Sequence, residues 1–389
     1  MKNYQKIMCG LLVIFLGALM TANSQASNLK LENNAYLLFG HQNNVWHNTI
    51  EKSDNKLEFG INSILNYKDT DIFFNLNLKG QRENFDKTSD YSIISIKPQF
   101  EYYTQTDIIF SSELFYNRGY EDYEEGISNA RDKLKNYRLN FAIGNYFKEK
   151  WFNQVSFNFA NYDYKEQLAM DRKIKSVGIL TEYNFFGKSF VYLKLGYSNI
   201  DYEVLNTLQD NKEIYLTTGM KGTLSDKVNG FADFTIKRKN YKSLNDITKA
   251  LINFEITTPL TKELKLTLGF NFDIAENYSG DYYDTPLLNN RYYELSILKS
   301  NFNYEINKEN NIDFTAKFSR KNYNDIQIQQ SKVIDKLVDL DLNYNRKLKV
   351  VNLDSIATIG AKYFSKDITP AGSGDYEGAE FYTKLNIKF

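Results

Sequence analysis

The strongest constraint on the fold is an alternation of apolar and polar residues that repeats along almost the whole chain. After residue 30, stretches of roughly 10 to 14 residues alternate with a period of two and are separated by polar turns. In the clearest stretch, one face carries Leu264, Leu266, Leu268, Phe270, Phe272 and Ile274, and the other carries Lys265, Thr267, Gly269, Asn271 and Asp273. One face suits lipid and the other suits water, so the pattern predicts membrane-spanning β-strands.

The predicted strands are even in number, and their connections alternate in length. We place strands at 31–42, 56–68, 71–84, 91–104, 107–119, 135–147, 151–164, 173–186, 189–203, 212–224, 230–242, 248–260, 262–275, 291–306, 311–324, 332–346, 349–365 and 379–389. Tight turns fall around Thr70, Thr106, Glu149, Gly187, Lys227, Thr261, Lys308 and Leu348. Short periplasmic turns that alternate with longer outer loops are typical of bacterial barrels. The sequence therefore predicts an all-β fold: a single transmembrane antiparallel up-and-down β-barrel of about 18 strands (16–18).

The N-terminus has the features of a secretory signal peptide. Lys2 and Lys6 precede an apolar stretch from Cys9 to Met20, and small residues follow at Ser24 and Ala26. We expect residues 1–26 to be a signal peptide and residues 27–389 to form the barrel. Cys9, the only cysteine, falls within the signal, so the mature chain is expected to have no disulfide and no thiolate metal ligand.

Two places interrupt the alternation. Pro98 falls inside a predicted strand, and the stretch from Tyr293 to Tyr304 changes parity near its middle. A β-bulge at each place would account for both interruptions. The other three prolines, Pro259, Pro286 and Pro370, fall in predicted turns or loops.

The chain ends in an amphipathic stretch with Leu385, Ile387 and a final Phe389. This ending resembles the C-terminal signature by which outer-membrane barrels are recognised by the barrel assembly machinery. Residues 248–324, with "LTKELKLTLGFNFDI" and "INKENNIDFTAKFSRKNYND", resemble the β-barrel porin families of Gram-negative bacteria. The resemblance implies a cell outer-membrane location and contact with outer-membrane lipids and lipopolysaccharide. It names no cargo.

The sequence offers little material for catalysis or metal binding. It contains only two histidines, His41 and His47, and neither lies in a serine or aspartate motif of a barrel enzyme. The acidic run 121–125 is the best candidate for binding Ca²⁺. A solvated loop that keeps the outer surface negative is the more common explanation of such a run. We expect no enzyme activity, no catalytic residues, no metal site and no cofactor.

Charged residues of both signs fall on the polar face of the predicted strands. Residues at alternate positions of a strand share one face, and we refer to this as sharing a parity. The pore-lining candidates are Lys79, Glu113, Lys194, Asp233, Lys237, Glu255, Lys265, Asp273, Asp313, Lys317, Asp339, Asp341 and Lys384. Such a mixture either sets up a transverse field in a wet lumen or pairs across strands without conferring selectivity. Tyrosines on the same parity, such as Tyr192, Tyr215 and Tyr382, either stack on sugar rings or fill space along the wall.

The predicted function is a porin-like channel for passive diffusion of small hydrophilic solutes, with oligosaccharides among the candidates. The alternative is a non-conducting barrel that binds or exports a surface polysaccharide, or acts in adhesion, through the loops 276–290 and 366–378. Without Lys2 and Lys6, 46 basic and 48 acidic residues remain, a net charge of about −2. No basic recognition stretch or phosphate-binding loop is present, so a nucleic-acid partner is not expected.

Overall fold

The chain forms one sheet of 18 antiparallel strands. The computed structural model describes residues 28–43, 53–85, 91–121, 132–148, 150–164, 171–203, 210–225, 227–242, 246–276, 292–328, 331–351, 353–369 and 375–388. The strands are β1 (Leu29–Gln42), β2 (Asp54–Lys68), β3 (Ile72–Phe85), β4 (Tyr91–Tyr103), β5 (Ile108–Glu121), β6 (Asp132–Phe147), β7 (Trp151–Tyr164), β8 (Arg172–Phe186), β9 (Ser189–Tyr202), β10 (Asn211–Ser225), β11 (Val228–Tyr241), β12 (Ile247–Pro259), β13 (Leu264–Glu276), β14 (Tyr292–Glu305), β15 (Asn310–Ile328), β16 (Ser331–Val350), β17 (Leu353–Thr369) and β18 (Tyr376–Lys388).

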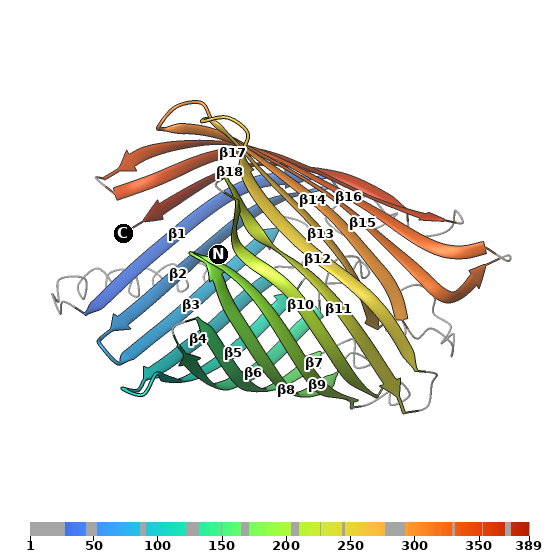
Figure 1. The fold of residues 1–389 in the computed structure, drawn as a ribbon. Coiled ribbons are helices and arrows are strands. Elements are labelled where there is room, and N and C mark those ends of the chain that lie inside the picture. Colours follow the sequence, from blue (N-terminus) through green and yellow to red (C-terminus); the bar gives the residue numbers. More distant parts are fainter. Residues whose placement is uncertain are drawn as a thin grey trace.

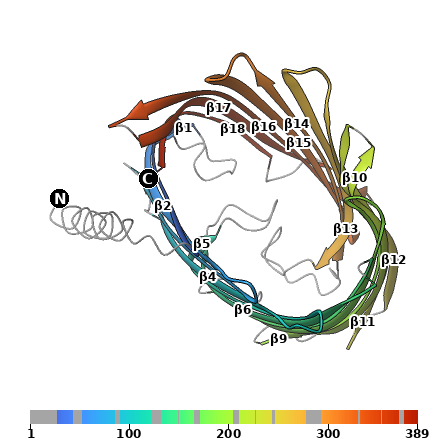
Figure 2. The same ribbon diagram turned by 60° about the vertical axis from the view of Figure 1, so that its left-hand side comes forward.

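The sheet closes on itself. Each strand pairs with its neighbours in sequence, and β1 pairs with both β2 and β18. Ala35, for example, lies opposite Ile61 on one side and Ile387 on the other. The strands therefore form the ring seen in Figures 1 and 2, and closure leaves the first and last strands without a free edge. This confirms the predicted up-and-down barrel of 18 strands. Among the described residues, no helix is long and apolar enough to cross a membrane.

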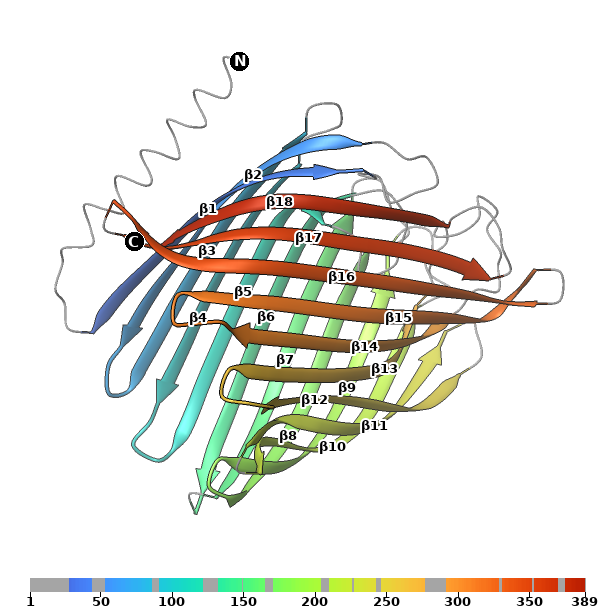
Figure 3. The ribbon, with the colours of Figure 1, turned by 90° about the horizontal axis from the view of Figure 1, so that it is seen from above.

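Most predicted strand ends agree with the structure to within about three residues, and the last four strands differ most. β15 continues to Ile328 and β16 starts at Ser331, so these strands project beyond their neighbours (Figure 3). The connection left between the predicted strands 311–324 and 332–346 is therefore too long. The turn predicted around Leu348 lies instead at Val351, which has a φ of 50° and separates β16 from β17. Strand pairing continues through Leu348–Ser355 and Lys349–Asp354, so the two strands extend beyond the predicted turn.

Neither predicted bulge is present. The pairing of β4 with β5 omits Lys97 and Pro98 but resumes at Gln99–Glu113 in the same register, because Pro98 lacks an amide donor but does not add a residue. The stretch from Tyr293 to Tyr304 pairs without interruption on both sides. Register shifts occur elsewhere, between Asn184 and Phe186, Thr223 and Ser225, and Tyr323 and Gln327.

The outer face of the barrel is apolar. Its exposed residues include Leu139, Phe141, Phe157, Leu193, Leu195 and Leu342. Near the tight turns it carries exposed aromatic residues, among them Tyr102, Phe147, Trp151 and Tyr304. An apolar band with an aromatic girdle is the surface that a transmembrane barrel presents to lipid and to the membrane interface.

Several sequence predictions concern residues outside the described part of the chain. These are the signal peptide, His47, most of the acidic run 121–125, most of the loop 276–290, residues 370–374 of the predicted loop 366–378, and Phe389. The predicted loop 366–378 is too long, because β17 continues to Thr369 and β18 starts at Tyr376.

Candidate functional site on the inner face of the barrel

Side chains on the concave face of the barrel contact one another across an intervening strand. Lys237 of β11 donates to Asp273 Oδ1 of β13 at 2.8 Å, and Lys221 of β10 bonds Glu182 of β8. Lys56 of β2 reaches Glu380 of β18 at 2.7 Å across β1. Because side chains from alternate strands converge only on the inside of a curved wall, these pairs identify the polar parity as the inner face.

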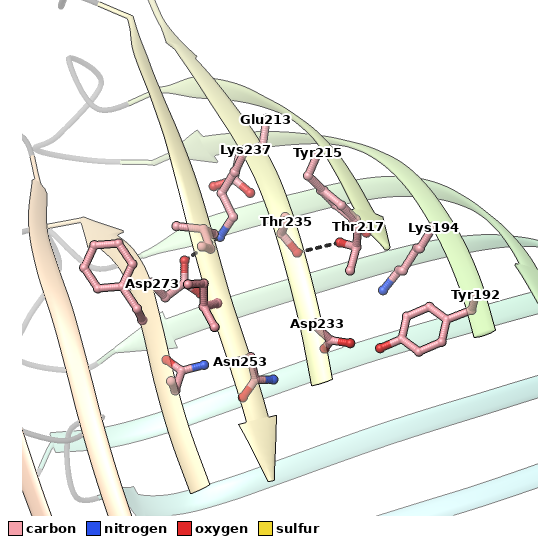
Figure 4. Close-up of a pocket in the computed structure, with 14 residues that line it drawn as sticks. Tyr192, Lys194, Glu213, Tyr215, Thr217, Asp233, Thr235, Lys237, Asn253 and Asp273 are labelled. Carbon is pink, nitrogen blue, oxygen red and sulfur yellow. Dashed lines mark hydrogen bonds and ion pairs between the residues drawn. The ribbon is translucent and has the colours of Figure 1, made fainter. Parts of the chain in front are cut away.

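One group of the predicted residues surrounds a cavity in the wall formed by β9 to β13 (Figure 4). Lys194, Asp233, Lys237 and Asp273 line this cavity, which has a volume of about 370 Å³. Hydroxyl and amide groups complete its polar surface, and these belong to Thr217, Thr235, Asn253 and Asn271. Thr217 and Thr235 share a hydrogen bond of 2.7 Å. The cavity thus presents both charge signs together with neutral polar groups.

The cavity charges differ in how they are paired. Lys237 and Asp273 form an ion pair, and Glu213 pairs with Lys239 at 2.6 Å. Lys194 Nζ lies 5.4 Å from the ring centroid of Tyr215, within range of a cation–π interaction. Asp233 Oδ1 is buried and has no hydrogen-bond partner among the described residues. The Asp233 carboxylate is hydrogen-bonded to Asn253. Lys194, which forms no ion pair among the described residues, is therefore the cavity cation best placed to bind a polar ligand, and Asp233 lines the same cavity.

A second group lies on β15, β16 and β18. Asp313 accepts hydrogen bonds from Asn303, from Asn311 at 2.9 Å and from Asn345 at 2.6 Å. Asp341 accepts from Asn343 at 2.9 Å and from the Tyr382 hydroxyl at 3.2 Å. Neutral amide groups thus surround Asp313, whereas Asp341 also lies 4.0 Å from the Lys362 ammonium.

The remaining predicted residues are spread around the barrel. Lys317 lies directly opposite Asp339 and Lys299. Lys384 Nζ lies 4.2 Å from the ring centroid of Tyr36, and Glu113 forms an ion pair with Lys97 at 3.0 Å. In the register of their strands, Lys79 lies opposite Asn62, Lys265 opposite Asn303, and Glu255 opposite Gly269.

The inner tyrosines lie flat on glycines of the neighbouring strand. Tyr36 faces Gly60, Tyr215 faces Gly196, and Tyr382 faces Gly360. A Cβ atom built on Gly196 would lie 2.1 Å from Cζ of Tyr215, and the other two glycines are covered as closely. Covering a glycine with a cross-strand aromatic ring stabilises a sheet. These tyrosines therefore pack along the wall, with at most one ring face available to a solute.

Sequence reasoning missed several charged residues of the inner face. These are Lys56, Glu58, Lys97, Glu182, Glu213, Lys221, Lys239, Lys249, Glu294 and Glu380. Extending each alternation to the strand ends would have identified most of them, because they share the parity of the residues that were predicted. Glu294 is the exception, since it lies on the opposite parity.

The closed barrel was compared with solved structures. OccAB3 of Acinetobacter baumannii superposes with a TM-score of 0.53 at 10% identity, over 93% of this chain and 100% of that one. The outer membrane protein OpdK of Pseudomonas aeruginosa gives 0.53 at 10% identity, over 92% and 99%. OpdL of Pseudomonas aeruginosa gives 0.54 at 10% identity, over 93% and 99%.

The chain has the fold of an outer-membrane porin. No protein-family model and no curated protein matches the sequence.

Of the two histidines considered for catalysis, His41 is the one that the structure describes. His41 lies at the end of β1, where its Nδ1 is 2.9 Å from Asn55 Oδ1 in an exposed contact.

Leu385 and Ile387 lie on β18, opposite Leu37 and Ala35 of β1. The end of the chain thus takes part in the closing seam of the barrel.

Proposed function

We propose that the protein is an outer-membrane channel through which small hydrophilic solutes diffuse passively. The observation that supports this proposal best is the closed 18-strand barrel with an apolar outer face and a charged, amide-rich inner face. Barrels with 16 to 18 strands are wide enough to enclose an aqueous channel. In this proposal the 13 predicted charged residues line the pore, and the partners of the barrel are outer-membrane lipids, lipopolysaccharide and the barrel assembly machinery.

Oligosaccharides are the solutes that the cavity in β9 to β13 favours. Tyr192 and Tyr215 offer ring faces beside Asn253, Asn271 and Asp233, which is the combination of stacking and planar polar groups that sugars bind. Because both rings already pack on wall glycines, we expect brief, weak contacts that guide a sugar along the wall.

Liposome swelling tests the channel directly. Proteoliposomes that contain the refolded protein are diluted into isosmotic solutions of a pentose, a disaccharide and a trisaccharide, and swelling is followed by light scattering. We expect rapid swelling in the pentose and slower swelling as the sugar grows. Swelling no faster than in protein-free liposomes would contradict a channel and favour a surface-binding role.

Maltooligosaccharides added during single-channel recording test the sugar preference. We expect brief current blocks whose frequency falls in Tyr192→Leu and Tyr215→Leu. Tyr382→Leu is the matched control, because it removes the same ring from a wall glycine outside this cavity. Equal blocking in all three variants would refute the role of the cavity while leaving the channel itself intact.

A further inference from the structure

The wall of the barrel is split between β12 and β13. Their pairing ends at Ile252–Phe272, although β12 continues to Ile247 and β13 to Glu276. The strands on either side remain paired over the same height, down to Lys239–Ile247 between β11 and β12 and to Glu276–Tyr292 between β13 and β14. The split therefore occupies the half of the wall on the side of the long connections.

The two edges of the split overlap. Ile274 has the parity of the lipid-facing residues of β13, and the sequence places it on the lipid face. In the structure it is only 3% exposed and packs against Tyr241, Ile247 and Leu251. Tyr241 shares its parity with Lys237 and Lys239, and Leu251 shares its parity with Asn253, so these residues belong to the inner face. The end of β13 must consequently lie on the lumen side of β12, and it leans inward in Figure 2.

The neighbouring strand gives the same geometry independently. Glu294 of β14 shares its parity with the exposed Leu298, but it accepts a hydrogen bond of 2.6 Å from Lys249 on the inner face of β12. This overlap explains the parity change seen in the sequence between Tyr293 and Tyr304 without a bulge. Among the described residues, side-chain contacts hold the split closed: the apolar cluster, the pair Lys249–Glu294, and Lys237–Asp273 at its base.

Opening this seam costs less free energy than separating two strands that are paired along their whole length. Separating paired strands breaks a series of backbone hydrogen bonds, each contributing about 0.5–1.5 kcal/mol. Between Leu251 and Asp273 that ladder is already absent. The cavity described above lies at the base of the split. It is lined by inner-face residues such as Asn253 and also by Ile252 and Phe272, which have the lipid-facing parity. Ile252 is 46% exposed on the outer surface.

We propose that the split is a lateral binding site for a lipid from the surrounding outer leaflet. The alkyl chain lies between Ile252, Phe272 and the apolar cluster, and the polar head group lies in the lumen beside Lys194 and Asp233. The mixed charges of the cavity suit a head group that carries both signs, as a phosphocholine does. This proposal does not require the barrel to conduct solutes.

Photocrosslinking tests the site in a bilayer. The protein is placed in nanodiscs that contain a lysophosphatidylcholine with a diazirine in its alkyl chain, and after illumination the labelled residues are mapped by mass spectrometry. We expect label on lumen-side residues of the split, such as Leu251 and Asn253, in addition to the outer belt. Label confined to the outer belt would overturn the proposal.

Closing the split should remove the lumen-side label. Bridging the double variant Lys249→Cys, Glu294→Cys with a short, reducible bis-methanethiosulfonate crosslinker is expected to lower it about tenfold, equivalent to about 1.4 kcal/mol of binding, and reduction should restore it. The matched control is Thr257→Cys, Thr267→Cys, which joins the same strands where they are already paired. Equal labelling in both crosslinked variants would overturn the proposal.

A second pair of variants acts in the opposite direction and needs no disulfide. Ile274→Ala removes part of the seal, so lumen-side labelling should increase, whereas Leu268→Ala on the paired part of β13 should leave it unchanged. No difference between these two variants would also overturn the proposal. Conductance recorded on the same preparations reports on the channel separately.

Discussion

The packing of Tyr215 on Gly196 leads to a quantitative prediction. A Cβ atom at residue 196 would lie 2.1 Å from Tyr215 Cζ, whereas ordinary contact begins at 3.4 Å. Gly196→Ala must therefore displace the ring by about 1.3 Å or turn it into the lumen. Overpacking of this kind destabilises a protein by about 1–3 kcal/mol.

A double-mutant cycle isolates this contact. In a Tyr215→Ala background the clash is absent, and Gly196→Ala should then be neutral or stabilising by about 0.5–1 kcal/mol, because glycine is unfavourable inside a strand. The expected coupling energy is about 0.5–3 kcal/mol, the range found for residues in contact. Equilibrium urea unfolding in phospholipid vesicles, followed by tryptophan fluorescence, measures each free energy of unfolding.

Gly269→Ala is the matched control. Gly269 also lies on the inner face, but its Cβ atom would be 3.6 Å from the nearest atom, the Phe254 carbonyl oxygen. Its effect on the free energy of unfolding should stay within about 0.5 kcal/mol. If Gly196→Ala behaves like this control, or if the cycle shows no coupling, the proposed packing of the inner tyrosines is refuted.

Three further predictions concern the wall and its assembly. Lys239→Met should lower the free energy of unfolding by about 3–5 kcal/mol, since Lys239 is buried and its loss leaves Glu213, which is only 13% exposed, without its ion-pair partner. Lys336→Met should change it by less than about 1 kcal/mol, because the pair with Asp367 is exposed; urea titration compares the two variants. Phe157→Lys should destabilise the barrel by about 2–4 kcal/mol in the same assay, because it places a charge against lipid. Asn158→Lys, on the inner face, should be tolerated, and similar losses in the two variants would contradict the assignment of the faces. Leu385→Asp with Ile387→Asp should reduce the folded, heat-modifiable fraction seen by gel electrophoresis after expression, and full assembly would refute the proposed signal.

The architecture was predictable because it follows from a local pattern. Alternation with a period of two fixes the face of each residue, and the alternating lengths of the connections fix the direction of each strand. Leu264 to Phe272 behave as the pattern predicts. The projecting end of the β15–β16 hairpin and the turn at Val351 were not predictable, because pairing there continues past the polar residues that usually end a strand.

The candidate site was less predictable, because it depends on relations between strands. Parity indicates that Lys237 and Asp273 share a face, but only the register brings them together across β12. The packing of tyrosines on glycines likewise depends on register. The position of Ile274 shows the limit of the pattern: its parity predicts lipid contact, and the inward lean of β13 buries it against the inner face of β12.

The central claim is that the barrel encloses a water-filled passage. The most direct test is single-channel conductance of the refolded protein, residues 27–389, in a planar bilayer across a salt gradient. The account predicts stable openings of nanosiemens order, with a reversal potential near zero because many inner charges are paired. A folded, heat-modifiable barrel that inserts but never conducts would contradict it.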